Sequence, residues 1–439
     1  MMKSEDLAIE YSDRNVTAWG GMKLMKDLVD RCGIKNMLRT CDLPQPQSNR
    51  GYDPIDIVES FWTSIWIGAS RFTHCSWLRF DTTLKEIFNW KEVPSQSTYS
   101  RFFSKFSLKR NTEVFPKIQR WFFEQLRFDN MTLDLDSSVM TRYGEQEGAK
   151  VGYNPQKRGR ASHHPLIAFM AEMRMVVNAY MRSGNTSSLS NVRSFLDETF
   201  GILQNKKVGL VRADSGFFSE DFMRYFENRA THYVVAAKFY APIKSELRNG
   251  KTWIRIADGI DITEWDYKLP GWSKTRRMVA VRKNVERRPK ASGRLLLFDV
   301  PEERYRYSTF VTDLDLPMQQ IWNMCRDRGD AENRIKELKY DFGADSFCLK
   351  KFFATEASFR FIMIAYNLIS LFRQIVLKEK NQATLSSIRF KCFALGSWIS
   401  RHANQRTLKI ALAREKRAWL DGLFDITRSA HPPFQFSNA

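Results

Sequence analysis

A carboxylate flanked by two cations occurs at helical spacing in the segment CRDRGDAENRIKELKYDF. Arg328 precedes Glu332 by four residues and Lys339 follows it by seven, so one α-helix would project all three from one stripe. A second stripe of this helix is apolar and consists of Ala331, Ile335, Leu338 and Phe342. Such a helix would pack on a core and hold its carboxylate at the rim of a cleft, open to a metal ion and a phosphate. Taken alone, the Arg-Glu spacing is more typical of a solvated ion pair.

Further carboxylates lie on predicted strands elsewhere in the chain. Asp134 and Asp136 alternate in MTLDLDSSVM, so both point to one face of a strand. Asp214 follows the apolar run 208–211, which places it at a strand end, where open sheets hold their sites. Asp136 could instead cap a turn, and Asp214 could be an ordinary turn residue before Gly216. Together, in a basic chain, the acids favour Mg²⁺ or Mn²⁺ and phosphodiester chemistry with two ions roughly 3.5–4 Å apart.

The elements that must position these acids predict an α/β protein. Strand-like segments at 131–140, 166–181 and 208–211, then a helix capped by Ser219, indicate a mixed sheet with helices packed on it. The second segment is expected to turn near residues 172–174. Between residues 233 and 311, six strand-like segments alternate with turn residues, and helical periodicity returns after Pro317 to about residue 424.

The N-terminal part, up to about residue 128, has helical periodicity at 20–38, 54–68 and 108–126. The segment PSQSTYSR offers Ser95 or Ser97 as the N-cap of another helix. That helix would present Arg101 and Lys105, which is compatible with a recognition helix in a DNA groove. A solvated basic helix in a bundle explains the same pattern equally well.

The charge balance indicates a polyanionic partner. The chain has 69 Lys+Arg against 49 Asp+Glu, a formal charge of +20 and a pI near 9.7, which points first to nucleic acid and next to an anionic membrane surface. Residues 373–419 hold eleven Lys/Arg and two Glu, which suits a surface facing phosphates. Arg158 and Arg160 flank a glycine in a predicted loop, which suits phosphate contact or a solvated loop.

No uncharged run approaches the ~20 residues of a membrane span, and the longest apolar candidate, 361–372, is better interpreted as a buried helix. Six cysteines form no C-x-x-C pair, so scattered free thiols in a reducing compartment are expected. We therefore expect a cytoplasmic protein.

The segments LDLDSSV, RADSGFFS and CRDRGDAENRIKELK resemble the three signature blocks of DDE-type insertion-sequence transposases. The branch they resemble has a β-rich insertion between the second Asp and the Glu and a Tyr-Arg-Glu-Lys signature on the last helix, and the resemblance runs from about residue 7 to 372. By this resemblance the catalytic, metal-binding acids are Asp136, Asp214 and Glu332, because the family's first Asp directly precedes two hydroxyl residues; Asp134 is the rival. Arg328 and Lys339 match the cations of the signature. Cys325 stands where the signature has Tyr.

The resemblance also implies an RNase H-like fold, Mg²⁺ that Mn²⁺ can replace, and a homodimer bound to terminal inverted repeats and target DNA. The implied reaction frees a 3′-OH at the element end, usually proceeds through a hairpin end in this branch, and joins target DNA. The expected regions are a helical DNA-binding domain (1–128), the catalytic core (129–232 and 317–377), a β-rich insertion (233–316) and a basic helical C-terminal region (378–439). The alternatives are a related DDE nuclease and an inactive or domesticated DNA-binding protein.

Overall fold

A nine-stranded mixed sheet runs through the middle of the computed structural model, which describes residues 7, 9–248, 250–284, 305–379 and 383–436. The strand order is β11-β12-β13-β14-β10-β9-β3-β7-β8. Its strands are β3 (Met131–Ser137), β7 (Leu166–Met170), β8 (Met175–Tyr180), β9 (Val208–Ala213), β10 (His232–Ala236), β11 (Ile254–Ala257), β12 (Ile260–Tyr267), β13 (Arg276–Asn284) and β14 (Tyr305–Thr312). The predicted turn between β7 and β8 is confirmed.

Five of these strands, β8-β7-β3-β9-β10, have the arrangement of an RNase H-like fold, which confirms the expected fold class. β3 pairs antiparallel with β7 and parallel with β9, and β9 pairs parallel with β10. Helices α8 (Val192–Leu203) and α9 (Glu220–Glu227, capped by Ser219) connect β8 to β9 and β9 to β10. Alternation in β3 buries Leu133 and Leu135 completely on one face and leaves the other face for its two aspartates.

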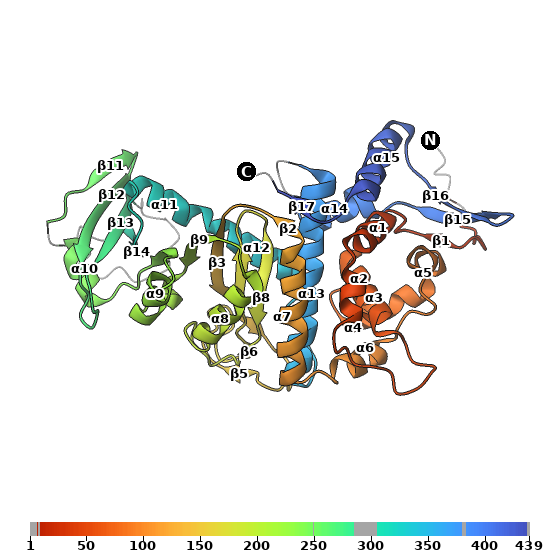
Figure 1. Cartoon of the computed structure of the whole chain (residues 1–439), viewed down its shortest axis with the longest axis horizontal. Coiled ribbons are helices and arrows are strands. Elements are labelled where there is room, and N and C mark those ends of the chain that lie inside the picture. Colours follow the sequence, from red (N-terminus) through yellow and green to blue (C-terminus); the bar gives the residue numbers. More distant parts are fainter. Residues whose placement is uncertain (1–6, 8, 249, 285–304, 380–382, 437–439) are drawn as a thin grey trace, which may run out of the picture.

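The β-rich stretch continues the same sheet, because β14 pairs with β10. β10 is therefore a strand of the central sheet although it lies at the start of the expected insertion. A helix that the sequence did not predict, α10 (Ala241–Arg248), precedes β11. The predicted strand at 294–300 lies outside the described residues. Figure 1 shows β11–β13 at one end of the molecule, with α11 leading back toward the centre.

The N-terminal part is helical, as expected, and packs on the catalytic part. Its helices are α1 (Met22–Cys32), α2 (Ile34–Arg39), α3 (Pro54–Trp66), α4 (Phe72–Cys75), α5 (Thr82–Phe88), α6 (Gln96–Phe103) and α7 (Leu108–Glu124). The indole N–H groups of Trp62 and Trp66 donate to the carbonyl oxygens of Phe361 and Ala365, at 2.9 and 3.2 Å. These bonds fix α3 against α13 (Phe352–Phe372), the long core helix.

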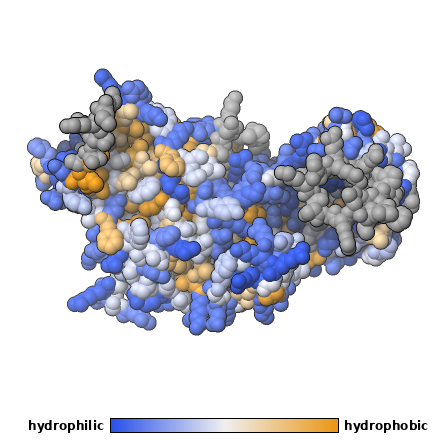
Figure 2. Space-filling model, turned by 180° about the vertical axis from the view of Figure 1, so that it is seen from behind, coloured by the Kyte–Doolittle hydropathy of each residue, from blue (hydrophilic) through white to orange (hydrophobic). Residues whose placement is uncertain are grey.

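Residues 352–377 form a helical segment long and apolar enough to cross a membrane, but 83% of its most apolar window is buried inside the protein, as expected for a core helix. Figure 2 shows a face where hydrophilic residues predominate and apolar residues form small patches. The remaining helices after Pro317 are α11 (Met318–Asp327), α12 (Gly329–Tyr340), α14 (Leu385–Ile388) and α15 (Arg414–Ser429), with short π-helical turns at Arg373–Leu377 and Arg389–Phe393.

The expectation of a wholly helical C-terminal region is wrong. A hairpin of β15 (Ser397–His402) and β16 (Gln405–Ile410) interrupts the helices. The hairpin pairs with β1 (Val16–Thr17), almost 400 residues away in the chain, and such a distant partner has no local signature. The other short strands are β2 (Leu126–Arg127) paired with β17 (Phe434–Gln435), and a small sheet of β4 (Met140–Thr141), β6 (Ala161–His163) and β5 (Lys150–Val151).

Candidate active site

Two aspartates reach one point from neighbouring strands. β3 and β9 are parallel and Leu135 lies opposite Ala213, so Asp136 and Asp214 follow side by side at the ends of their strands. The Oδ1 atom of Asp214 accepts the N–H of Gly216 at 2.8 Å, so the predicted turn role is also met. One oxygen of each carboxylate is tied by local backbone bonding, because Asp136 Oδ1 accepts the N–H of Ser137 at 2.6 Å. The second oxygen of Asp214 has no hydrogen-bond partner within the described part of the chain, whereas the second oxygen of Asp136 accepts a bond from Arg328.

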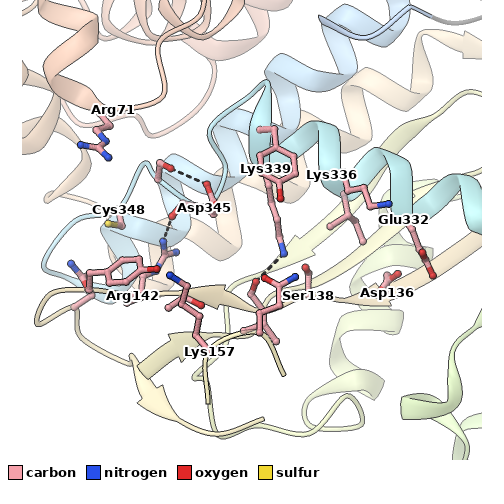
Figure 3. A pocket seen from close by; sticks show the side chains of 18 of the residues that line it. Arg71, Asp136, Ser138, Arg142, Lys157, Glu332, Lys336, Lys339, Asp345 and Cys348 are labelled. Carbon is pink, nitrogen blue, oxygen red and sulfur yellow. Dashed lines mark hydrogen bonds between the residues drawn. The ribbon is translucent and has the colours of Figure 1, made fainter. Parts of the chain in front are cut away.

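Glu332 reaches the same cleft from the first turn of α12. The cleft has a volume of about 760 Å³, and Asp136, Asp214 and Glu332 all line it. Figure 3 shows Glu332 and Asp136 close to each other, with Lys336 and Lys339 further along the same helix. The apolar stripe of α12 is buried, as predicted, and this holds the polar stripe at the rim. The structure thus brings together the three acids that the sequence singled out.

The electrostatics of Asp136 record this convergence. The pKa of its carboxyl is raised to about 6. Burial is the main cause, and the neighbouring Asp214 and Glu332 add to it, whereas Arg328 and the N–H of Ser137 act to lower the pKa. A carboxylate that is costly to ionise beside two other acids is a site that a divalent cation would stabilise. The donor set is entirely oxygen, which suits Mg²⁺ or Mn²⁺.

The protein itself supplies the counter-charge to Asp136. Arg328, between α11 and α12, donates from Nη2 to Asp136 Oδ2 at 3.1 Å and to the carbonyl oxygen of Leu135 at 3.4 Å. Its Nε is buried and has no hydrogen-bond partner among the described residues, while the side chain as a whole lines the cleft and places a positive charge there. Within the described ranges, no three His, Cys, Asp or Glu side chains are grouped closely enough to hold an ion as they stand. The acids fit a divalent ion by type, and they line one cleft.

Asp134, the rival to Asp136, is a structural residue in this geometry. Its carboxylate is fully buried and accepts two bonds from Arg212, at 2.7 and 2.9 Å, and it does not line the cleft. Arg212 also donates to the carbonyl oxygen of Met324 at 2.7 Å. The pair therefore ties α11 to the sheet and helps to position Arg328, which follows α11 directly.

Several cations line the cleft that the sequence did not single out. Lys339 was expected there, and its Nζ donates to the carbonyl oxygen of Val139 at 2.9 Å, while burial lowers its pKa. The unexpected ones are Arg71, Arg142, Lys157 and Lys336. Lys157 is a near neighbour of the arginine pair that was singled out, but Arg71 comes from the N-terminal helices, and only the tertiary fold reveals it.

The other predicted DNA-contacting residues do not line the cleft, although Arg160 lies 6.0 Å over the ring of Tyr143, which does. Arg158 and Arg160 are exposed and do not line it. Arg101 is exposed near the end of α6, whose N-cap is Ser95 as predicted. The expected single helix through Arg101 and Lys105 is wrong, because α6 ends at residue 103 and Lys105 donates instead to the carbonyl oxygen of Gln45 at 2.9 Å. Contact of these residues with DNA stays a prediction.

Cys325 is packed in a small apolar cluster on α11 with Ile321 and Trp322, and does not line the cleft. Burial raises the pKa of its thiol to about 12, so it remains protonated at neutral pH. All six cysteines are free, as expected. The chain thus has no phenol at this signature position and no reactive thiolate in its place.

Comparison with known proteins identifies the family. Residues 1–429 match the family described as Transposase DDE domain group 1. The chain belongs to this family. It is therefore a DNA transposase and a metal-dependent DNA-cleaving enzyme, and its partner is DNA.

Among solved structures, this DDE transposase is similar to a piggyBac transposase synaptic complex with hairpin DNA, with a TM-score of 0.44 and 11% identity over 87% of this chain and 82% of that chain. No curated protein sequence matches it.

Proposed function

We propose that the transposase moves an insertion sequence by a cut-and-paste route, with Asp136, Asp214 and Glu332 as its catalytic acids. The observation that carries the proposal is that these three acids line one cleft together with Arg328 and Lys339. When bound, a pair of Mg²⁺ ions, or Mn²⁺ in their place, would activate a nucleophile and stabilise the leaving oxygen.

The residues of the chain supply the remaining functions. The three carboxylates would hold the ions, and Ser137 and Gly216 orient two of them through backbone N–H groups. Arg328 would offer its guanidinium charge to the scissile phosphate, because its side chain lines the cleft beside Asp136. Lys339 is held toward the first strand by its bond to Val139, where it suits a neighbouring phosphate.

The enzyme is proposed to act as a homodimer on paired terminal inverted repeats, in the bacterial cytoplasm. A dimer is supported by the reaction itself, because two element ends must be cut and joined together. Size-exclusion chromatography with light scattering, with and without end-containing DNA, tests this: a complex with one protein chain would contradict it.

The catalytic assignment is tested by nicking of end-containing DNA with and without Mg²⁺. Glu332→Gln, which keeps the shape of the side chain, should lower the rate by more than roughly 100-fold, since loss of a direct ligand exceeds a typical loss in the surrounding shell. DNA affinity should stay at the wild-type value. Equal activity of both proteins would remove Glu332 from the mechanism, and a joined product would distinguish a transposase from a nuclease.

A further inference from the structure

The β15–β16 hairpin is a cationic ribbon at the end of the molecule opposite the β11–β14 extension. Figure 1 shows it projecting past α5, away from α12 and β3. Each strand has six residues, and β16 is the outer strand in the order β1-β15-β16. Residues 401–407 are exposed without interruption. Leu408 and Ile410 near the base of the ribbon pack against the core. The exposed tip contributes little to the core, so the composition of the tip requires another explanation.

The charge of this segment is one-sided. Residues 401–417 contain six Lys/Arg and one acid, and all six cations are exposed. Arg401 pairs with Glu86 at 2.9 Å. Arg406 and Lys409 have no ion pair or hydrogen bond from their side chains within the part of the chain that the structure describes. Three further cations follow in the first turn of α15: Arg414, Lys416 and Arg417.

The register places like charges together. Arg401 lies directly opposite Arg406 on the antiparallel ladder, so both guanidinium groups project from one face. Like charges in this position destabilise a hairpin. A cation on an outer strand does block edge-to-edge pairing, but one lysine such as Lys409 serves that purpose. Glu86 offsets the charge of Arg401, so Arg406 is the member of this facing pair whose charge remains for an outside anion.

The opposite face combines an aromatic ring with hydrogen-bonding side chains. Trp398 lies opposite Lys409, and Arg14 stacks over its ring at 4.8 Å from the centroid. The pairs Ser400–Thr407 and His402–Gln405 continue this face toward the turn. Hydroxyl, amide and cationic groups on a single face are the donors that contact phosphate and sugar oxygens.

We propose that this ribbon binds duplex DNA outside the cleft, with Arg406 and Lys409 on backbone phosphates. The dimensions suit it: two strands about 4.8 Å apart form a ribbon that the roughly 12 Å wide major groove admits. The inference rests on the proposed function only in taking the element's own DNA as the bound duplex. It adds a binding surface remote from the three acids, which would hold flanking DNA while the cleft holds the scissile strand.

The test uses the full chain and a 5′-labelled duplex of about 40 base pairs that carries an element end, with anisotropy measured from about 50 to 200 mM salt. Arg406→Ala/Lys409→Ala should reduce the slope of log affinity against log salt by about two and weaken binding on the order of 10- to 30-fold at 150 mM salt. The charge-conserving control, Arg406→Lys/Lys409→Arg, should bind like the wild type, because a phosphate contact requires charge more than shape. Melting temperatures of both variants should match the wild type.

An unchanged affinity and salt slope in the alanine variant would overturn the proposal. The same holds if DNA binding is intact and the oligomeric state changes, since the ribbon would then be a protein contact. If the wild type itself fails to nick, the proposed function fails, while the salt-slope comparison still decides the role of the ribbon.

Discussion

Asp134 and Asp136 lie two residues apart on β3, yet neutralising each should have opposite consequences. Asp134→Asn is expected to destabilise the fold, and any loss of cleavage should follow from unfolding. Asp136→Asn is expected to leave the fold as stable as the wild type or more stable, and to abolish cleavage. The two substitutions remove the same charge from the same strand, so each is the matched control of the other.

The loss of unfolding free energy expected for Asp134→Asn follows from the buried ion pair between Asp134 and Arg212. The side chains of Asp134 and Arg212 are 0% and 8% exposed, and two charge-assisted bonds of 2.7 and 2.9 Å join them. Removing the carboxylate leaves a buried guanidinium without its main counter-charge, and breaking such a pair costs about 3–5 kcal/mol. That is a large part of the stability of a typical domain, so urea unfolding should shift to clearly lower concentration.

Asp136→Asn is expected to change the free energy of unfolding in the opposite direction, by stabilising the fold. The folded-state pKa of Asp136 is raised to about 6 from its ordinary value of 3.8, so ionisation of this carboxyl costs folding free energy as pH rises. The difference of about two pKa units corresponds to at most about 3 kcal/mol, and the lost bond from Arg328 offsets part of it. The expected gain is about 1–2 kcal/mol at pH 7.5. It should fall to well under about 1 kcal/mol at pH 4, close to the unfolded-state pKa, and vanish below about pH 3, where the wild-type carboxyl is protonated in both states.

The assay combines urea denaturation, followed by circular dichroism at pH 4 and 7.5, with nicking of end-containing DNA in Mg²⁺. The reasoning is refuted if Asp134→Asn unfolds at the wild-type urea concentration and is inactive. It is also refuted if Asp136→Asn cuts at the wild-type rate. Full activity of Asp136→Asn together with loss of activity in a folded Asp134→Asn would make Asp134 the catalytic acid.

Three further predictions concern the core, a titrating carboxyl and the ions. The side-chain amide of Asn367 accepts the N–H of Val176 at 2.7 Å and donates to its carbonyl oxygen at 2.8 Å, on the outer strand β8. Asn367→Leu should therefore lower the free energy of unfolding by about 2–4 kcal/mol in urea melts. An unchanged free energy would show that water replaces the amide. The pKa of half-buried Asp56 is raised to about 6 by burial and by Asp53 and Glu59, so Asp56→Asn should stabilise the protein by about 1 kcal/mol above pH 6 and not below pH 4; a pH-independent gain in melting temperature would contradict this. Mn²⁺ at about ten times its dissociation constant should add roughly 1.4 kcal/mol of stability to the wild type in thermal melts; equal protection of Asp214→Asn would place the ion elsewhere.

Local patterns were sufficient for the elements that carry the acids. Three local patterns predicted which residues are buried in these elements: the alternation in 131–137, the apolar run before Asp214 and the apolar stripe of α12. Because β3 and β9 are parallel neighbours in an RNase H-like sheet, the strand ends had to bring Asp136 and Asp214 together. The convergence of these two acids was therefore accessible through the resemblance to DDE transposases, which implied this sheet, and not through the spacing alone.

Pairings between distant segments were not accessible. The bidentate pair of Asp134 with Arg212 distinguishes it from Asp136, yet both acids have the same periodicity. Arg71 joins the cleft from a different helical layer, and β15 exists because β1 pairs with it. In each case the partner lies tens to hundreds of residues away, so spacing along the chain carries no signal for it.

The central claim is that Asp136, Asp214 and Glu332 together hold the ions that cut DNA. Anomalous diffraction from crystals of the transposase with end-containing DNA and Mn²⁺ measures this directly. We expect two peaks roughly 3.5–4 Å apart, both within coordination distance of Asp136 and each also contacting Asp214 or Glu332. Peaks at Asp134, or peaks beyond the reach of Glu332 with DNA in the cleft, would contradict the account.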